Sequence, residues 1–420
     1  MMVNTHPKIK AIQQIHRPAQ SARELGYRMP AQWEPQACVW VVPPHNPETW
    51  PGCFEAAQQQ HADWVEAMRP HVEVRTAAEL GIATDDSWIR DFGPLFVVKH
   101  PPPTDPKPCS GCCGTGGSCA SRSSNAQTEA QADAEAQPHC DNPAKSTSCE
   151  SAPQTTLNAD TSATAIQDPL AAHDFHFNAW GAKYEGQRPL DDVVPQHLAK
   201  SMGIPLWVHD FVLEGGSIDV NGKGAVMTTR QCLFSANRNP WASAEVIEQT
   251  LHDALGTRHV IWLPGGIVGD DTDGHIDDVA RFVNAQTVVV VVAPEGHSDH
   301  AITRRNLNAL RDAVDQDGNK LNIIGLPTPD PVIYDFPNLP GVDEPGQHPV
   351  PASYANFLIS NSAVFVPVFG QASDDIACAV LERVLPGKSI VPIRAEHLAV
   401  GLGALHCLSM QQPQVFAPGS

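Results

Sequence analysis

Four short segments of the sequence gather side chains that can attack an electrophile, carry a proton or hold a charge. They span residues 85–94, 214–217, 271–278 and 401–407. The last of them follows a glycine-containing turn and ends in Cys407, and a thiolate is nucleophilic near neutral pH, where a hydroxyl is not. Cys407 is therefore a candidate nucleophile. A bystander thiol fits as well, since three other cysteines lie in apolar patterns typical of the core, namely Cys38, Cys232 and Cys378.

The third segment is acidic like a calcium loop, but its spacing is wrong. With Gly274 at the obligatory glycine of an EF-hand, Gly269 and Ala280 fall where carboxylate ligands are required. A zinc site at His275 and Asp277 would need further ligands, and neither His-Glu-x-x-His nor a pair of Cys-x-x-Cys motifs occurs. The motifs of the common serine hydrolases and of dinucleotide- and nucleotide-binding proteins are also missing, which excludes those classes.

The composition limits the partners of the protein. The 420 residues include 27 Lys and Arg against 47 Asp and Glu, a formal net charge of -20. Nucleic-acid binders gather cations to neutralise phosphates, so no nucleic-acid partner is expected, whereas a cationic substrate would be attracted. An acidic surface that serves only solubility fits the charge too. The longest apolar run, residues 287–293, is too short to cross a bilayer, so no membrane partner is expected.

Two stretches stand apart from the rest of the chain. Residues 1–25 are predicted to be a flexible leader of a cytoplasmic protein, with an organellar transit segment as the alternative because the region is basic. Residues 26–420 are predicted to form one catalytic domain. A disordered surface insertion interrupts it at about residues 101–170, which contain no aromatic residue. Six of the eleven cysteines lie there. Two interpretations fit them, a disordered, redox-sensitive tail and a metal site.

The remaining sequence repeats a strand, strand, helix, strand pattern, which predicts a closed, pseudo-symmetric α/β assembly. An open doubly wound sheet is the alternative, although it favours single strands between helices. The first unit has strands 211–220, 224–229 and 259–263 with helix 241–255 between an Asn239-Pro240 start and a Gly256 stop. The others are strands 279–283, 287–293 and 321–326 with helix 303–314; strands 354–360, 363–369 and 389–393 with helix 374–385; and an incomplete unit, strands 38–42 and 72–75 with helix 54–68.

The four segments, together with five further motifs in the same order, closely resemble the agmatine deiminases, which are related to the bacterial-type peptidylarginine deiminases. The further motifs are residues 26–35, 177–181, 237–240, 353–357 and 411–413. The resemblance covers nearly the whole chain outside the leader and the insertion. It implies a five-bladed α/β propeller built from the ββαβ modules. It also implies catalytic Cys407, His275, Asp91 and Asp277, with Glu214 and Trp88 lining the substrate site.

These residue types suit the implied reaction, which hydrolyses the guanidinium of agmatine to N-carbamoylputrescine and ammonia in putrescine synthesis. Asp91 and Asp277 would hold the forked cation through charge-assisted hydrogen bonds and place its carbon over the Cys407 sulfur. His275 would protonate the departing ammonia and then activate water against the covalent thiouronium. The implied enzyme needs no metal or organic cofactor, and a homo-oligomer is left open.

One departure from the family pattern concerns the turn before the nucleophile. Leu402 stands where relatives have the second of three glycines. If that position requires a positive φ, leucine strains the turn and can misplace Cys407. Two other functions also fit the sequence. One is a deiminase of free or peptidyl arginine, and the other is an inactive scaffold or metal-binding protein that acts through the cysteine-rich insertion.

Overall fold

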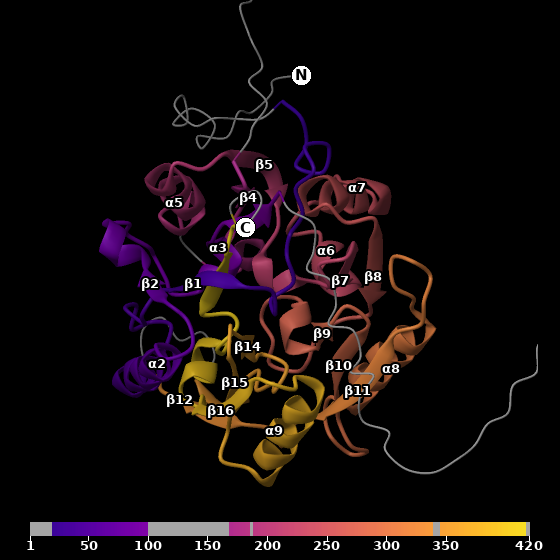
Figure 1. The fold of residues 1–420 in the computed structure, drawn as a ribbon. Coiled ribbons are helices and arrows are strands. Elements are labelled where there is room, and N and C mark those ends of the chain that lie inside the picture. The colour runs from indigo at the N-terminus through magenta and orange to yellow at the C-terminus, as the bar shows by residue number, and fades with distance from the viewer. Residues whose placement is uncertain (1–18, 100–167, 185–187, 339–344, 417–420) are drawn as a thin grey trace, which may run out of the picture. The chain divides into compact units, whose positions relative to one another are not determined.

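The computed structural model describes residues 19–99, 168–184, 188–338 and 345–416 (Figure 1). The chain divides into two compact units, Met1–Pro103 with Ile166–Ser420, and Thr104–Ala165. Every residue of the second unit, and with it all six cysteines of the predicted insertion, lies outside the described ranges. Most of the predicted leader does too. Within its described end, Ala22 is buried, and the Trp207 indole donates a 2.8 Å hydrogen bond to the carbonyl of Gln20.

Within the described residues, five three-stranded sheets share one arrangement, in which the first two strands are antiparallel and the second and third are parallel. The predicted ββαβ modules are therefore present. In chain order the sheets are β3 Leu95–Val98, β4 Leu170–His176 and β5 Leu206–Val212; β6 Ile218–Val220, β7 Ala225–Thr229 and β8 His259–Leu263; β9 Ala280–Asn284, β10 Thr287–Val292 and β11 Asn322–Pro327; and β14 Leu358–Ile359, β15 Ala363–Val368 and β16 Ser389–Arg394. The fifth is β17 Ser409–Pro413, β1 Gln36–Val41 and β2 Val74–Thr76.

A helix links the two parallel strands of every module, because strands that run in the same direction cannot be joined by a tight turn. Figure 1 shows the linking helices at residues 194–202, 300–312 and 372–384 beside strands of their own modules. The last turn of two of them is stopped by a glycine in the left-handed conformation, Gly203 at φ 66° and Gly256 at φ 65°. The linking helices are α2 Phe54–Met68, α5 Val194–Met202, α7 Ala244–Leu255 after the short α6 Arg230–Leu233, α8 His300–Asp312 and α9 Ala372–Val384.

The two ends of the described chain meet in one sheet. β17 supplies the antiparallel partner of β1, with Val41 opposite Ser409 and Trp40 opposite Met410. The strand begins two residues after Cys407, so its position relative to the first module fixes the loop that carries this cysteine. A separate two-stranded hairpin, β12 Ile333–Phe336 with β13 Gly346–Pro349, stands outside the five modules.

Several predicted boundaries were correct and others were wrong. The helix over residues 54–68 and the stop at Gly256 are confirmed. The predicted strand over residues 211–220 is wrong, because a turn of 3₁₀ helix at Gly215–Ser217 separates β5 from β6. Helix α7 does not begin after Asn239-Pro240; Ser243 caps it by accepting a hydrogen bond from the Val246 N–H. The proposed end of the insertion at residue 170 overlaps β4.

The central strands of the modules are buried along nearly their whole length. In β10 five consecutive valines follow Thr287, and all but Val292 are buried. Continuous burial is typical of strands covered on both faces, in contrast to the alternation of a half-exposed strand. None of the helices among the described residues is long and apolar enough to span a membrane.

Candidate active site

The structure brings four of the predicted residues together around Gly216. A Cβ atom placed on this glycine would lie 2.6 Å from His275 Nδ1, 2.8 Å from Asp91 Oδ1 and 3.1 Å from Asp277 Oδ2. The Cys407 sulfur lies 3.5 Å from Asp277 Oδ2. Three modules and the loop before β17 therefore contribute one residue or more each to a single cluster.

Short turns at strand ends present these side chains. Asp91 lies on α3, Ile89–Phe92, just before β3, and Asp277 lies on a 3₁₀ turn, Ile276–Asp278, just before β9. Cys407 follows the 3₁₀ turn Leu398–Gly401. The Arg90 backbone N–H donates to the Cys407 carbonyl at 3.2 Å, which joins the first and last of these segments directly.

The Asp91 carboxylate is held from two sides. The Trp180 indole donates to Oδ2 at 2.8 Å, and the Gly216 backbone N–H donates to Oδ1 at 3.0 Å. Burial raises the pKa of Asp91 well above its usual range, and the nearby Asp277 raises it further. An arriving cation would relieve both effects, so the site favours a positively charged ligand.

An unusual backbone turn orients Trp180. Four consecutive residues, Ala179–Ala182, have φ values of 55°, 55°, 86° and 56°, which is the left-handed region. Only Gly181 adopts it without steric cost, and such strain persists where the surrounding structure enforces it. The Asn178 side chain stabilises the turn by accepting a 2.9 Å hydrogen bond from the Gly181 N–H. The strained turn directs the Trp180 indole N–H toward Asp91.

The Asp277 carboxylate has one occupied and one open oxygen. Oδ2 accepts from His406 Nδ1 at 2.7 Å, whereas Oδ1 is buried and has no hydrogen-bond partner among the described residues. Burial raises the pKa of this carboxyl to about 7, even though Arg281 and Arg90 act to lower it. A buried acceptor without a donor is costly, so Oδ1 is a strong candidate for a contact with substrate.

His275 is likewise unpartnered and fully buried. In the described part of the chain neither ring nitrogen has a hydrogen-bond partner, and Nδ1 stands 3.6 Å from Asp91 Oδ1. Burial lowers the pKa of His275 well below its ordinary value, with Arg238 contributing in the same direction. The imidazole is therefore neutral in the unliganded protein and is ready to accept a proton.

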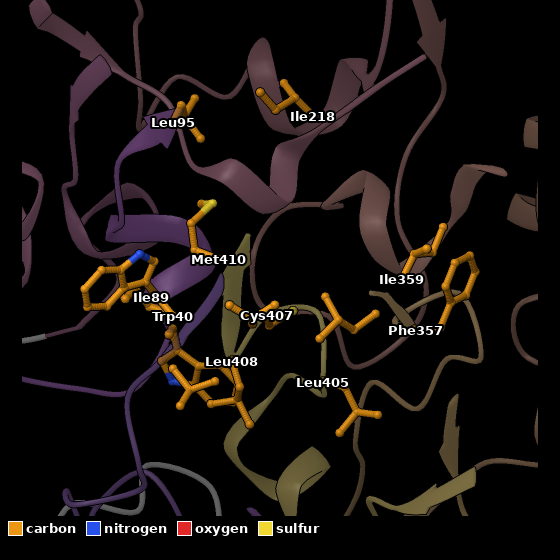
Figure 2. Close-up of a cluster of buried hydrophobic side chains, with 14 of the residues drawn as sticks. Trp40, Ile89, Leu95, Ile218, Phe357, Ile359, Leu405, Cys407, Leu408 and Met410 are labelled. Carbon is orange, nitrogen blue, oxygen red and sulfur yellow. The ribbon is translucent and has the colours of Figure 1, made fainter. Parts of the chain in front are cut away.

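Cys407 is buried between apolar and acidic neighbours. Figure 2 shows it among Leu405, Leu408 and Met410 of its own segment. Burial raises the pKa of its thiol well above the usual value, and Asp277, Asp278 and Asp91 raise it further. The unliganded protein thus holds Cys407 as a thiol, and a cation in the site would favour the thiolate.

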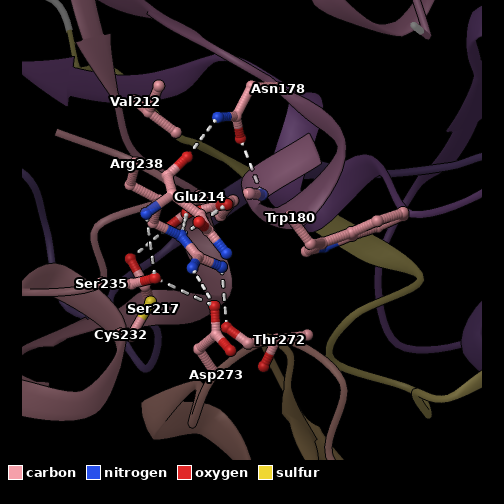
Figure 3. Close-up of polar contacts among 12 residues, drawn as sticks. Asn178, Trp180, Val212, Glu214, Ser217, Cys232, Ser235, Arg238, Thr272 and Asp273 are labelled. Atoms are coloured by element: carbon pink, nitrogen blue, oxygen red, sulfur yellow. Dashed lines mark hydrogen bonds and ion pairs between the residues drawn. The ribbon is translucent and has the colours of Figure 1, made fainter. Parts of the chain in front are cut away.

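The two predicted lining residues have different surroundings. Trp88 is buried against the turn before the nucleophile, since a Cβ on Gly403 would lie 2.5 Å from its ring. Glu214 is already paired, because Arg238 Nε lies 3.0 Å from both carboxylate oxygens and the two side chains are fully buried. Figure 3 shows that the same guanidinium also reaches Thr272 and Asp273, so Arg238 ties Glu214 to the loop that leads into His275.

Sequence reasoning did not assign a role to three neighbours of the cluster. They are Trp180, His406 and Asn356, whose side-chain N–H donates to the Cys407 sulfur at 3.0 Å. Each lies inside a motif that carried the family resemblance. The motifs alone gave no reason to separate these residues from packing residues, because their contacts join segments more than fifty residues apart.

Comparison with known proteins identifies the family. A model of the Porphyromonas-type peptidyl-arginine deiminase family matches residues 28–110 and 121–413. The chain belongs to this family. The chain is 29% identical over 428 residues to the agmatine deiminase of Pseudomonas aeruginosa (strain LESB58), and the match covers 94% of this chain and 98% of that protein. It is 28% identical over 421 residues to an agmatine deiminase of Pseudomonas putida (strain KT2440), covering 93% and 96%.

Solved structures agree with that placement and match the α/β fold. The agmatine deiminase of Enterococcus faecalis superposes with a TM-score of 0.74 at 25% identity, over 95% of this chain and 99% of that one. A cysteine-to-serine variant of the C. jejuni agmatine deiminase with substrate bound superposes with a TM-score of 0.68 at 25% identity, over 92% and 96%.

Gly216 offers a test of the cluster, because the surrounding side chains leave no room for a Cβ atom there. We expect Gly216→Ala to lower kcat/KM at least about 100-fold, since its methyl group would push His275 and Asp91 out of position. It should also lower the free energy of unfolding by about 1–3 kcal/mol through overpacking. Steady-state ammonia release and urea unfolding measure the two effects. Gly81→Ala is the control, because nothing lies within 4 Å of its Cβ position and its φ is positive. Equal activity losses in both variants would contradict the crowding argument.

Leu402 adopts the conformation that the sequence left in question. Its φ is 69° and its ψ is 29°, so a leucine occupies a left-handed position next to the nucleophile loop. We expect Leu402→Gly to raise the free energy of unfolding by about 0.5–1 kcal/mol, because glycine removes the steric cost. Urea denaturation checks this. Leu402→Ala is the control, since alanine keeps the Cβ clash, and equal stabilisation by both changes would contradict strain as the cause.

Proposed function

We propose that this protein is an agmatine deiminase, which hydrolyses agmatine to N-carbamoylputrescine and ammonia in putrescine synthesis. The observation that carries the proposal is the cluster of Cys407, His275, Asp91 and Asp277, in a chain whose named relatives are agmatine deiminases along nearly their full length. The open oxygen of Asp277 and the unprotonated ring nitrogen of His275 supply acceptors for the donors of a guanidinium.

In the proposed reaction, Asp91 and Asp277 hold the planar guanidinium between them and place its carbon against the Cys407 sulfur. Their negative charge is compensated by the substrate, and the added cation favours loss of the thiol proton to solvent. The thiolate then forms a carbon–sulfur bond, and the guanidinium carbon becomes tetrahedral.

His275 moves the protons in the following steps. Its neutral imidazole first takes up a proton from solvent, which replaces the one that the thiol released, and donates it to the departing nitrogen. The carbon–nitrogen bond then breaks, and ammonia leaves a thiouronium on Cys407. The neutral imidazole then takes a proton from water as the water oxygen attacks the same carbon. The carbon–sulfur bond breaks, the hydroxyl proton passes to solvent as the carbonyl forms, and the carbamoyl product and the thiolate are freed. His275 then returns its proton to solvent. The mechanism uses side chains of this chain and water.

The family resemblance also supports a five-bladed propeller as the architecture of residues 26–420. Five modules of identical strand order support it, as does the pairing of β17 with β1, because such pairing joins the last module to the first. One central site would then be lined by the segments before β3, β6 and β9 and by the loop that follows the 3₁₀ turn Leu398–Gly401.

Ammonia release from agmatine and from arginine separates the proposed function from its nearest alternative. We expect agmatine to give the higher kcat/KM by at least about 100-fold. The site favours a small free guanidine over peptidyl arginine, because the exposed fractions of its side chains are low: 4% for Cys407, 5% for Asp91 and 0% for His275 and Asp277. A preference for arginine or for an arginyl peptide would overturn the assignment.

The affinity for a guanidinium should depend on pH through Asp277. Because the pKa of this carboxyl is raised to about 7, it is protonated below that pH and must lose its proton to hold a cation. For the Cys407→Ala variant, which cannot turn over, we expect the Kd of agmatine to fall about tenfold between pH 6 and 7 and to change less above pH 7.5. Isothermal titration calorimetry measures the slope.

Asp277→Asn in the same Cys407→Ala background is the control for this slope. Because asparagine cannot ionise, agmatine binding to the double variant should release about one proton fewer, so its Kd should depend less on pH. The pH dependence that remains should come from Asp91, whose pKa is also raised. An affinity that stays constant from pH 5.5 to 8 would exclude an ionising carboxylate as the cation's partner.

A further inference from the structure

The side chain of Asn356 makes four hydrogen bonds around the candidate nucleophile. Its Oδ1 accepts from the backbone N–H of His406 at 2.9 Å and from that of Cys407 at 3.4 Å. Its Nδ2 donates to Cys407 Sγ at 3.0 Å and to Asp278 Oδ1 at 2.9 Å. The side chain is fully buried, just before β14, in a module that gives no residue to the predicted catalytic set.

These partners fix which way the amide points. Two backbone N–H groups can only donate, so the oxygen of Asn356 must face them, and the NH₂ group must then face the sulfur and Asp278. The orientation is therefore set by chemistry and not by the similar shapes of oxygen and nitrogen. A donor is held permanently against the sulfur of Cys407.

The acidic surroundings of Cys407 disfavour its thiolate, so a hydrogen-bond donor to the sulfur has a large effect. The charged and titratable groups facing the sulfur are mainly acidic and oppose a second negative charge, namely Asp91, Asp277 and Asp278, with Arg90 and His406 beyond them. Of these acids, Asp277 lies at 3.5 Å from the sulfur, so it can accept the S–H but cannot stabilise the thiolate. Among the described residues, Asn356 donates a side-chain N–H to this sulfur.

We propose that Asn356 is a catalytic residue that stabilises the Cys407 thiolate through its side-chain N–H. The assignment rests on the proposed function only in naming the thiolate as the reacting species. When the thiol ionises, the S–H bond breaks, the proton leaves for solvent, and the Nδ2–H···S contact becomes charge-assisted and stronger. The donor is already in place, so no reorganisation accompanies the reaction. A purely structural role, in which Asn356 only holds the loop through Oδ1, is the alternative.

Alkylation of Cys407 by iodoacetamide tests this without any substrate. The rate is followed from pH 6 to 11 by mass spectrometry of the peptide that contains Cys407, and its midpoint reports ionisation of this thiol. For Asn356→Ala we expect the midpoint to rise by about 1–2 pH units and kcat/KM at pH 7.5 to fall about 100-fold or more. The lost activity should be partly recovered at higher pH, since more thiolate then forms.

A control in the same segment separates ionisation from loosening of the loop. Ser353 Oγ donates to the Asp278 carbonyl at 2.7 Å and accepts from the Ala355 N–H at 3.1 Å, so Ser353→Ala removes two buried hydrogen bonds without touching the sulfur. We expect this variant to lose stability but to keep the alkylation midpoint of the wild type. If Asn356→Ala also keeps it, Asn356 only positions the loop and the proposal is wrong.

Asn356→Asp provides a second variant if the alanine protein does not fold. The carboxylate keeps an acceptor for the two backbone N–H groups but replaces the donor to sulfur with a second anionic oxygen. Its alkylation midpoint should rise at least as far as that of Asn356→Ala, and an unchanged or lower midpoint would overturn the proposal. Because alkylation needs no agmatine, an enzyme that failed to turn over agmatine would refute the proposed function and leave this test intact.

Discussion

Replacing Cys407 by alanine should abolish agmatine turnover, with a fall in kcat of about 10⁴-fold or more. The sulfur forms and breaks the covalent bond on which the proposed reaction depends, and water would have to attack a resonance-stabilised cation without it. Ammonia release measures the loss. Alanine retains the backbone, and its segment is held by other contacts, including the Arg90 N–H to the carbonyl of residue 407.

Cys407→Ser is the matched variant for this experiment. Its hydroxyl has nearly the shape of the thiol but does not ionise near neutral pH, so we expect it to be as inactive as the alanine variant. Both proteins should still bind agmatine, which calorimetry can show, because Asp91 and Asp277 remain. A variant that kept more than about a tenth of the wild-type kcat would exclude Cys407 as the nucleophile.

The second large effect is expected at His275. We expect His275→Ala to lower kcat about 10³-fold, because one imidazole serves as acid for the departing ammonia and as base for the incoming water. The ring has no hydrogen-bond partner among the described residues, so its removal should disturb the fold little. The loss should therefore appear in kcat far more than in the unfolding midpoint.

An analogue with a better leaving group can divide the two roles of His275. In the S-methylisothiourea analogue of agmatine, methanethiol departs with much less need for a proton from the enzyme than ammonia does. His275→Ala should still form the covalent adduct from it but hydrolyse that adduct slowly. Mass spectrometry should then find the adduct on Cys407 in the variant and little in the wild type. Rapid hydrolysis by the variant would show that another group activates water.

The sequence predicted much of the fold because its local signals were consistent. The helix at residues 54–68 and the stop at Gly256 follow from apolar periodicity and from glycine's access to a positive φ. The error over residues 211–220 arose because Leu213 and Glu214 continue an extended pattern up to Gly215. The break there is accompanied by contacts across modules, such as the hydrogen bond from the Gly216 N–H to Asp91, which local patterns do not contain.

The candidate site shows the same limit more sharply. The motifs predicted Cys407, His275, Asp91 and Asp277, and the structure brings these four side chains together. The unpredicted contacts are those that a single residue makes across long stretches of chain. Asn356 lies 51 residues from Cys407, and Trp180 lies 89 residues from Asp91. Nothing in the local sequence distinguishes such an asparagine or tryptophan from one that only packs.

The pairing of β17 with β1 has a consequence for folding during translation. During translation β1 leaves the ribosome long before β17, the strand that pairs with it and completes its sheet. The nascent chain therefore cannot assemble the nucleophile loop until β17 has emerged. A product that terminates before β17 is expected to be inert.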